Sequence, residues 1–276
     1  KLHKAAKNLV DDYELQITAA FLSSKLDAPM ILLNSSITQA FWGEKLEESD
    51  DEGQVSLKRL DDQSVVLSIR SFTHQAGIET GEAIDEIARN EYANLFIDLR
   101  GSRGTIPSAM LQISKYIIEE PMVVGFAPNR KWYAANEGPP TLKDVDKFNT
   151  FTEGSFREFI DSAAQGNGQI LKISPSEHSF QGRVFLLING STQGFAEMII
   201  AGLKRENVVV IAGESSAGSM RLLRPLRIGP DLELLLSAND FVNLEGESIR
   251  SSPIEPHVKV DLDEDYAFVA ALLEGQ

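Results

Sequence analysis

The chain has 276 residues, of which 42% are hydrophobic, enough to bury a large core in one large domain or two small ones. A formal net charge of −15 argues against nucleic-acid binding, which needs clustered Lys and Arg, and disfavours anionic membrane surfaces. No segment has the roughly 18 consecutive apolar residues of a membrane span, and the lack of cysteine excludes disulfides, thiolate metal sites and cysteine nucleophiles.

The N-terminal part of the chain differs in pattern from the rest. Residues 4–42 carry apolar side chains at helical spacing and predict a helical subdomain. The acidic run 47–52 indicates an exposed linker, because a run of like charges is usually solvated. We therefore expect a helical N-terminal subdomain with its linker over residues 1–53 and an α/β domain over residues 54–276.

From residue 54 onward, strand-like and helix-like segments alternate, which predicts helices packed on a sheet with parallel neighbouring strands. The predicted strands span residues 55–60, 64–72, 94–99, 121–126, 169–173, 183–189, 207–212, 221–228, 232–236 and 258–262. The predicted helices span residues 79–92, 106–119, 153–164, 194–205 and 265–273. Residues 129–149, rich in proline and polar side chains, predict a long loop in which Trp132 and Tyr133 either contact a ligand or anchor the loop.

One strand, turn and helix stand out as a candidate catalytic segment. Residues 184–197 read as a buried apolar strand, a short polar turn and a helix start, the arrangement that presents a nucleophile above a sheet. Gly194 occupies the position of that nucleophile. Because glycine has no side chain, no covalent intermediate can form there.

Three segments in the same order, residues 95–105, 184–197 and 213–220, resemble the motifs of the C-terminal processing (tail-specific) serine peptidase family. That family is related to the tricorn protease core and to interphotoreceptor retinoid-binding modules. The resemblance spans about residues 63–262 and implies the crotonase-like (ClpP/crotonase) spiral α/β fold. Many members carry a peptide-binding PDZ domain, for which this chain has too few residues before its first predicted strands.

The resemblance also implies roles for individual residues. Aligned without gaps, the serine nucleophile of the family corresponds to Gly194 and its general-base lysine to Ser219. The oxyanion-hole donors correspond to the backbone N–H groups of Gly104 and Phe195. Beside them, Thr192 and Ser216 are candidate ligand-binding residues, together with Trp132 and Tyr133.

Neighbouring charged residues have simpler explanations. Asp98 and Arg100, at the end of a buried strand, are either a catalytic acid and an oxyanion-binding group or a structural ion pair or turn cap, and we expect the latter because a buried carboxylate must be paired. Glu197, in the first turn of a helix, is either a cap or a supporting partner of the site, and we expect a cap. The four histidines show no metal-ligand spacing and no phosphate-binding loop occurs, so we expect neither a metal nor a cofactor.

These observations predict a catalytically degenerate serine peptidase-family protein that binds a polypeptide, a chain terminus or an apolar small molecule. The alternative is an active serine-type peptidase, in which Gly194 is an engineered substitution or another hydroxyl, such as that of Ser191 or Ser215, serves as nucleophile. A module that uses the fold only as an interaction surface is a third hypothesis. Because members of the family are frequently exported, we lean toward an extracytoplasmic location, and the sequence leaves the oligomeric state open.

Overall fold

The computed structural model describes residues 30–34, 54–104, 107–154, 156–218, 222–227, 232–249, 252–261 and 266–274. Its contacts divide the chain into two units, one formed by residues 1–46 with 222–239 and the other by residues 47–221 with 240–276. Each unit is described by itself below.

The first unit contains a three-stranded antiparallel sheet. Strand β1 (Met30–Asn34) pairs with β13 (Leu232–Asn239), which pairs in turn with β12 (Leu222–Arg227). The sequence pattern assigned β12 and β13 to the α/β domain and predicted no strand before residue 54. Because β1 hydrogen-bonds to β13, residues 222–239 belong with the N-terminal unit instead. The helical prediction for the remainder of residues 1–53 falls outside the described residues.

The second unit is built on a six-stranded sheet whose strand order is β14-β11-β10-β5-β3-β2. Neighbouring strands run parallel except β2, which pairs antiparallel with β3. Its strands are β2 (Val55–Arg59), β3 (Ser64–Ile69), β5 (Asn94–Asp98), β10 (Arg183–Ile188), β11 (Val210–Gly213) and β14 (Val258–Lys259). This arrangement confirms the predicted sheet with parallel neighbours.

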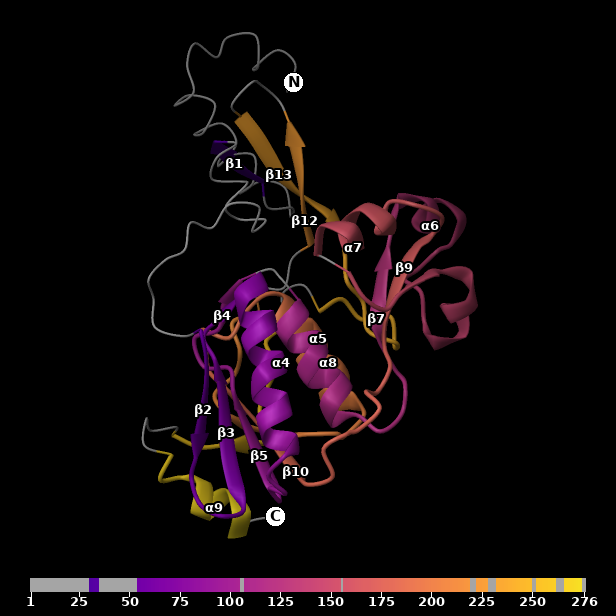
Figure 1. Cartoon of the computed structure of the whole chain (residues 1–276). Coiled ribbons are helices and arrows are strands. Elements are labelled where there is room, and N and C mark those ends of the chain that lie inside the picture. Colours follow the sequence, from indigo (N-terminus) through magenta and orange to yellow (C-terminus); the bar gives the residue numbers. More distant parts are fainter. Residues whose placement is uncertain are drawn as a thin grey trace. The chain divides into compact units, whose positions relative to one another are not determined.

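Helices cover this sheet on both faces, which explains why β3, β5 and β10 are continuous apolar runs that are buried almost throughout. Figure 1 shows α4 (His74–Ala88), α5 (Ser108–Ile117) and α8 (Phe195–Arg205) lying together on one side of the strands. On the other face, α9 (Val269–Glu274) and the residues before it pack against alternate strand residues. In the centre of that layer, the rings of Phe96 and Phe185 stack with centroids 4.7 Å apart.

A second, three-stranded sheet of order β7-β9-β8 lies beyond α5 in the sequence. It consists of β7 (Met122–Pro128), β8 (Asn149–Phe151) and β9 (Gly168–Ile173), with α7 (Phe156–Ala163) between β8 and β9. The short strands β4 (Ser71–Phe72) and β6 (Arg103–Gly104) form a separate parallel pair.

The predicted long loop over residues 129–149 contains more structure than its composition indicated. It holds the short helix α6 (Arg130–Ala135) and the 3₁₀ helix η1 (Leu142–Lys147) before β8 begins. The side chain of Asn129 accepts a hydrogen bond from the Lys131 N–H at 2.8 Å and so caps α6. Elements of six residues are too short to produce a recognisable apolar period, which is why the sequence pattern missed them.

Candidate functional site

The three motif segments meet at one edge of the six-stranded sheet, where β5, β10 and β11 end. The Thr192 hydroxyl donates to the Leu99 carbonyl oxygen at 2.8 Å, and the Gly101 N–H donates to the Asn189 side-chain oxygen at 3.1 Å. The third segment joins them because the Ala217 N–H donates to the Thr192 carbonyl oxygen at 3.0 Å. Ligands of open α/β sheets bind at the carboxyl ends of parallel strands, so this edge is the candidate site.

The turn after β10 is shaped by its own polar side chains. The side-chain oxygen of Asn189 also accepts from the Ser191 N–H at 3.1 Å, an Asx-type turn. Thr192 is fully buried, and its hydroxyl oxygen accepts from the Asn189 N–H at 3.1 Å while donating to the Leu99 carbonyl. The hydrogen bonds of Thr192 therefore hold the turn in shape.

Gly194 ends this turn and is the N-cap of α8, with φ 76° and ψ −136°. Residues with a side chain rarely adopt a positive φ of this kind, and those that do are strained. A sharp, strained turn between a strand and a helix is the geometry in which α/β hydrolases hold their nucleophile. The backbone at the end of this turn is therefore in a conformation that favours glycine, and the assignment of Gly194 to the nucleophile position stays a prediction.

Glu197 connects this turn to the loop after β11. Its carboxylate is almost completely buried and accepts hydrogen bonds from the Gly194 N–H at 3.1 Å, the Ser216 hydroxyl at 2.6 Å and the Gly218 N–H at 2.6 Å. The Ser216 oxygen in turn accepts from the Ile254 N–H at 2.8 Å. The predicted cap is confirmed, but the same carboxylate also holds a second loop, which the sequence did not indicate.

The remaining predicted site residues fall into two groups. Gly104 lies in β6, opposite Phe72 of β4, and Phe195 is the buried first residue of α8, whose ring packs edge-on against Phe159. Ser219, the general-base position, lies outside the described residues, one position after Gly218.

Trp132 and Tyr133 lie on α6, beside the three-stranded sheet of β7, β9 and β8. Trp132 is buried in a cluster with Phe126 and Phe148, and its indole N–H donates to the Gly138 carbonyl oxygen at 2.8 Å. These contacts anchor the segment to its sheet. Tyr133 is 43% exposed, and burial of its ring, followed by the charge of Asp240, raises its pKa.

Asp98, at the end of β5, is the centre of a buried ionic network that confirms the predicted ion pair. Its two carboxylate oxygens accept from Nε and a terminal nitrogen of Arg100 at 2.9 and 2.8 Å, and the Arg70 guanidinium adds a bond at 3.2 Å. Burial alone would raise the pKa of the Asp98 carboxyl, but the hydrogen bonds and charge of Arg100, with the charge of Arg70, hold that pKa below its ordinary value. Asp98 is therefore ionised and fully paired.

A buried tyrosine extends this network. The Tyr266 hydroxyl donates to Asp98 at 2.8 Å and lies 3.1 Å from the hydroxyl oxygen of Ser68. Burial raises the pKa of Tyr266, and the charge of Asp98 raises it further. The guanidinium of Arg100 lies over the Tyr266 ring, 5.3 Å from its centroid. No pattern in the sequence indicated Tyr266, because it is 168 residues from Asp98.

The described part of the chain shows neither a metal-binding cluster nor a membrane-spanning helix. Among those residues, no group of three His, Asp or Glu side chains is placed to hold a metal ion. None of the helices among them is long and apolar enough to cross a membrane.

Comparison with known proteins supports the resemblance found in the sequence. Similar solved structures include a putative peptidase from Parabacteroides merdae ATCC 43184, with 16% identity, a TM-score of 0.62, and coverage of 96% of this chain and 83% of that one. A lipoprotein from Streptococcus agalactiae has 12% identity and a TM-score of 0.68, covering 99% of this chain and 85% of that one. The photosystem II D1 C-terminal processing protease has 13% identity and a TM-score of 0.57, with 76% of this chain and 48% of that one covered.

At these identities the structural likeness shows the fold, and it confirms the predicted fold of the tail-specific peptidases. A search of curated proteins found no significant match. The sequence model of peptidase family S41 matches residues 64–260, which is more than half of the chain and includes all three motif segments. The chain therefore belongs to peptidase family S41.

Proposed function

We propose that this S41 family member does not cleave peptide bonds and instead binds a polypeptide segment, a chain terminus or an apolar small molecule where the three motif loops meet. One observation carries the proposal: Gly194 stands at the tip of the strand-turn-helix, at a positive φ that glycine adopts freely, and has no side chain that can attack a carbonyl group. Ser219 at the general-base position adds a second departure from the serine-lysine pair.

The hydroxyl groups next to Gly194 have other roles. Thr192 and Ser216 are buried, and both hydroxyls donate and accept hydrogen bonds. Thr192 donates to Leu99 of another loop and accepts from Asn189 of its own turn, whereas Ser216 joins Glu197 to Ile254. Within the described part of the chain, no lysine or histidine is hydrogen-bonded to either hydroxyl, so neither has the base that a serine or threonine nucleophile requires.

The binding half of the proposal rests on backbone groups. We propose the N–H groups of Gly104 and Phe195 as donors to a carbonyl or carboxylate of the ligand, because backbone donors do not depend on the side chain at Gly194. The start of α8 adds the positive end of a helix dipole, which favours a negative charge at that place.

A fluorophosphonate probe, which reacts covalently with activated serines, tests the loss of catalysis. We expect no labelling of the purified protein and no cleavage of fluorescently labelled casein. Labelling of Ser191 or Ser215 would instead establish an active peptidase with a relocated nucleophile.

The double variant Gly194→Ser, Ser219→Lys tests whether the scaffold around the missing groups is competent. We expect it to react with the probe, whereas the matched double variant Gly194→Ala, Ser219→Lys does not. If both double variants stay unlabelled although they are folded, the loops do not form the site that we propose.

Photocrosslinking tests binding. Benzoylphenylalanine placed at Ser191, an exposed residue of the turn, should crosslink to casein, and the same group at the exposed Lys143 of η1 should not. Equal crosslinking from both positions, or none from either, would contradict binding at the turn.

A further inference from the structure

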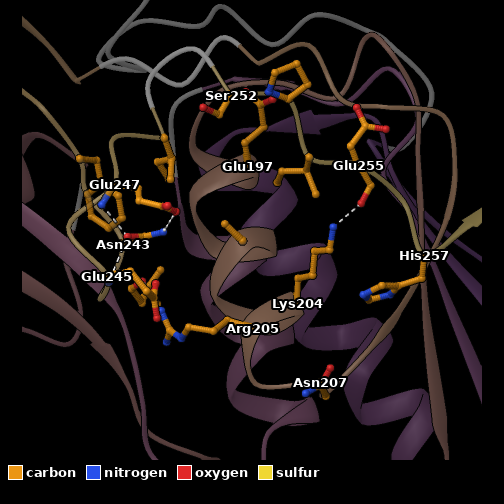
Figure 2. Close-up of a pocket in the computed structure, with 16 residues that line it drawn as sticks. Glu197, Lys204, Arg205, Asn207, Asn243, Glu245, Glu247, Ser252, Glu255 and His257 are labelled. Carbon is orange, nitrogen blue, oxygen red and sulfur yellow. Dashed lines mark hydrogen bonds between the residues drawn. The ribbon is translucent and has the colours of Figure 1, made fainter. Parts of the chain in front are cut away.

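A second concave site lies beside α8. It is a pocket of about 560 Å³ lined by α8, Val124, Asn207 and residues within 241–249 and 252–257, and every residue that lines it belongs to the second unit. Its apolar surface comes from Val124, Ala201, Phe241, Ile249, Pro253 and Ile254. The volume is typical of a small-molecule site, and Figure 2 shows the polar side chains that surround it.

One side of this pocket presents hydrogen-bond donors. Lys204, half-buried on α8, donates to the Glu255 carbonyl oxygen at 2.5 Å. The Glu255 carboxylate also lines this side, where a hydrogen bond from Ser215, followed by the charges of Lys259 and Lys204, lowers its pKa, but its ion pair is with Lys259, at 3.4 Å. The Nδ1 atom of His257 accepts from the Ile211 N–H at 3.0 Å, so Nε2 carries the proton of the neutral ring. Partial burial and the charge of Lys204 lower the pKa of His257, which favours this neutral donor form.

The other side presents carboxylates. The side-chain oxygen of Asn243 accepts from the N–H groups of Glu245 and Glu247, at 3.1 and 2.8 Å, and thereby shapes a turn that carries both glutamates. Figure 2 shows this turn across the pocket from Lys204 and His257. Arg205 lies on the same side as the turn, but its guanidinium pairs with Glu206 at 2.8 Å. No Lys or Arg of the described residues forms an ion pair with Glu245 or Glu247.

With Glu255 paired to Lys259 and Arg205 paired to Glu206, the ionisable groups left for a ligand are Lys204 and His257 on one side of the apolar surface and Glu245 and Glu247 on the other. An anionic amphiphile that spanned it would meet the glutamates, and a cationic one would meet Lys204. A ligand with one charge of each sign satisfies both ends, because electrostatic complementarity penalises like charges brought together.

We propose that this pocket binds a short peptide with free termini, its carboxylate at Lys204 and His257, its ammonium group at Glu245 and Glu247, and an apolar side chain between them. The proposal does not depend on the function of the Gly194 turn. The pocket borders the candidate site through Glu197, which bonds to Gly194, and through Ile254, whose N–H bonds to the Ser216 hydroxyl oxygen.

Calorimetric titration with the tripeptide Ala-Leu-Ala tests the proposal on the unaltered protein. We expect saturable binding, which amidation of the peptide carboxylate weakens about tenfold or more, as the loss of a charge-assisted hydrogen bond predicts. Acetylation of the amino terminus should weaken binding about two- to threefold, because Glu245 and Glu247 are exposed. No saturable binding up to about 5 mM, or equal affinities for the free and amidated peptides, would overturn the proposal.

Two lysine variants test whether the peptide binds in this pocket. In Lys204→Met the difference between the free and amidated peptides should fall below about twofold, because the positive charge that recognises the carboxylate is gone and only the neutral His257 donor remains. The control Lys143→Met alters an exposed lysine of η1 outside the pocket and should keep the full difference. Circular dichroism confirms that both are folded. If the difference persists in Lys204→Met, the peptide binds elsewhere and the assignment to this pocket is wrong.

Discussion

Two buried carboxylates at the same edge of the sheet are stabilised in different ways. Asp98, after β5, is neutralised by two guanidinium groups and a tyrosine hydroxyl. Glu197, on α8 after β10, accepts from two backbone N–H groups and a serine hydroxyl. The first carboxylate anchors charged side chains, whereas the second holds together the loops that carry the motifs. The difference separates residues that stabilise the sheet edge from those that shape the candidate site.

The largest loss of folding stability is expected at the buried ion pair between Asp98 and Arg100. Asp98→Ala leaves the Arg100 guanidinium, whose side chain is 11% exposed, without its partner, so we expect a loss of about 3 to 5 kcal/mol in the free energy of unfolding. Urea denaturation followed by circular dichroism measures it. A loss below about 1 kcal/mol would show that the ionic network of Asp98 does not stabilise the fold as a buried ion pair should.

The pH dependence of folding stability also tests whether Asp98 is ionised and paired in the folded chain. Because the pKa of Asp98 is lower in the folded chain than in the unfolded one, its contribution is fully present above the unfolded pKa of about 3.9 and is lost as the pH falls through the folded pKa. The stability difference between the wild type and Asp98→Asn should be constant from about pH 7 to 5 and shrink below about pH 4. A difference that grows on acidification would contradict the paired, ionised state.

Loss of the second carboxylate should cost somewhat less. Glu197→Leu deprives Gly194, Ser216 and Gly218 of their common acceptor, and we expect a loss of about 2 to 4 kcal/mol. Glu197→Gln keeps one acceptor oxygen and should lose about half as much. Hydrogen exchange of the Gly194 and Gly218 amides should accelerate in Glu197→Leu. Unchanged exchange at both amides would show that the carboxylate does not hold the loops.

A smaller effect is expected at Gly194 itself. Its φ of 76° is strained for any residue with a Cβ, so Gly194→Ala should destabilise the protein by about 1 to 3 kcal/mol. Gly138 is the matched control, because a Cβ there meets no atom within 4 Å, and Gly138→Ala should be neutral or stabilise by up to about 1 kcal/mol. Equal changes in the free energy of unfolding for the two variants would show that the backbone at Gly194 is not strained for a residue with a Cβ.

The smallest loss of folding stability is expected on removal of the Tyr266 hydroxyl. Tyr266→Phe removes one hydrogen bond to Asp98 and should lower the free energy of unfolding by about 1 kcal/mol. Tyr133→Phe changes a 43% exposed ring outside the network and should have no measurable effect. If the two variants are equally stable, the hydroxyl does not contribute to the pairing of Asp98.

The sequence alone determined the alternation of strands and helices in the second unit, the family and the position of Gly194. These are local properties, since burial imposes a period on neighbouring residues and a motif is a short stretch of chain. Local patterns failed where elements are short, as in α6 and η1, and where a strand finds its partner far along the chain, as β1 does with β13.

Only the tertiary structure decided which side chains meet. Glu197 reaches Gly218, 21 residues away, and Asp98 reaches Tyr266, 168 residues away. The pocket beside α8 likewise depends on side chains from residues 241–249 and 252–257 that lie close to that helix. Such contacts depend on how the sheet brings distant loops to one edge, and the spacing of residues along the chain carries no record of that placement.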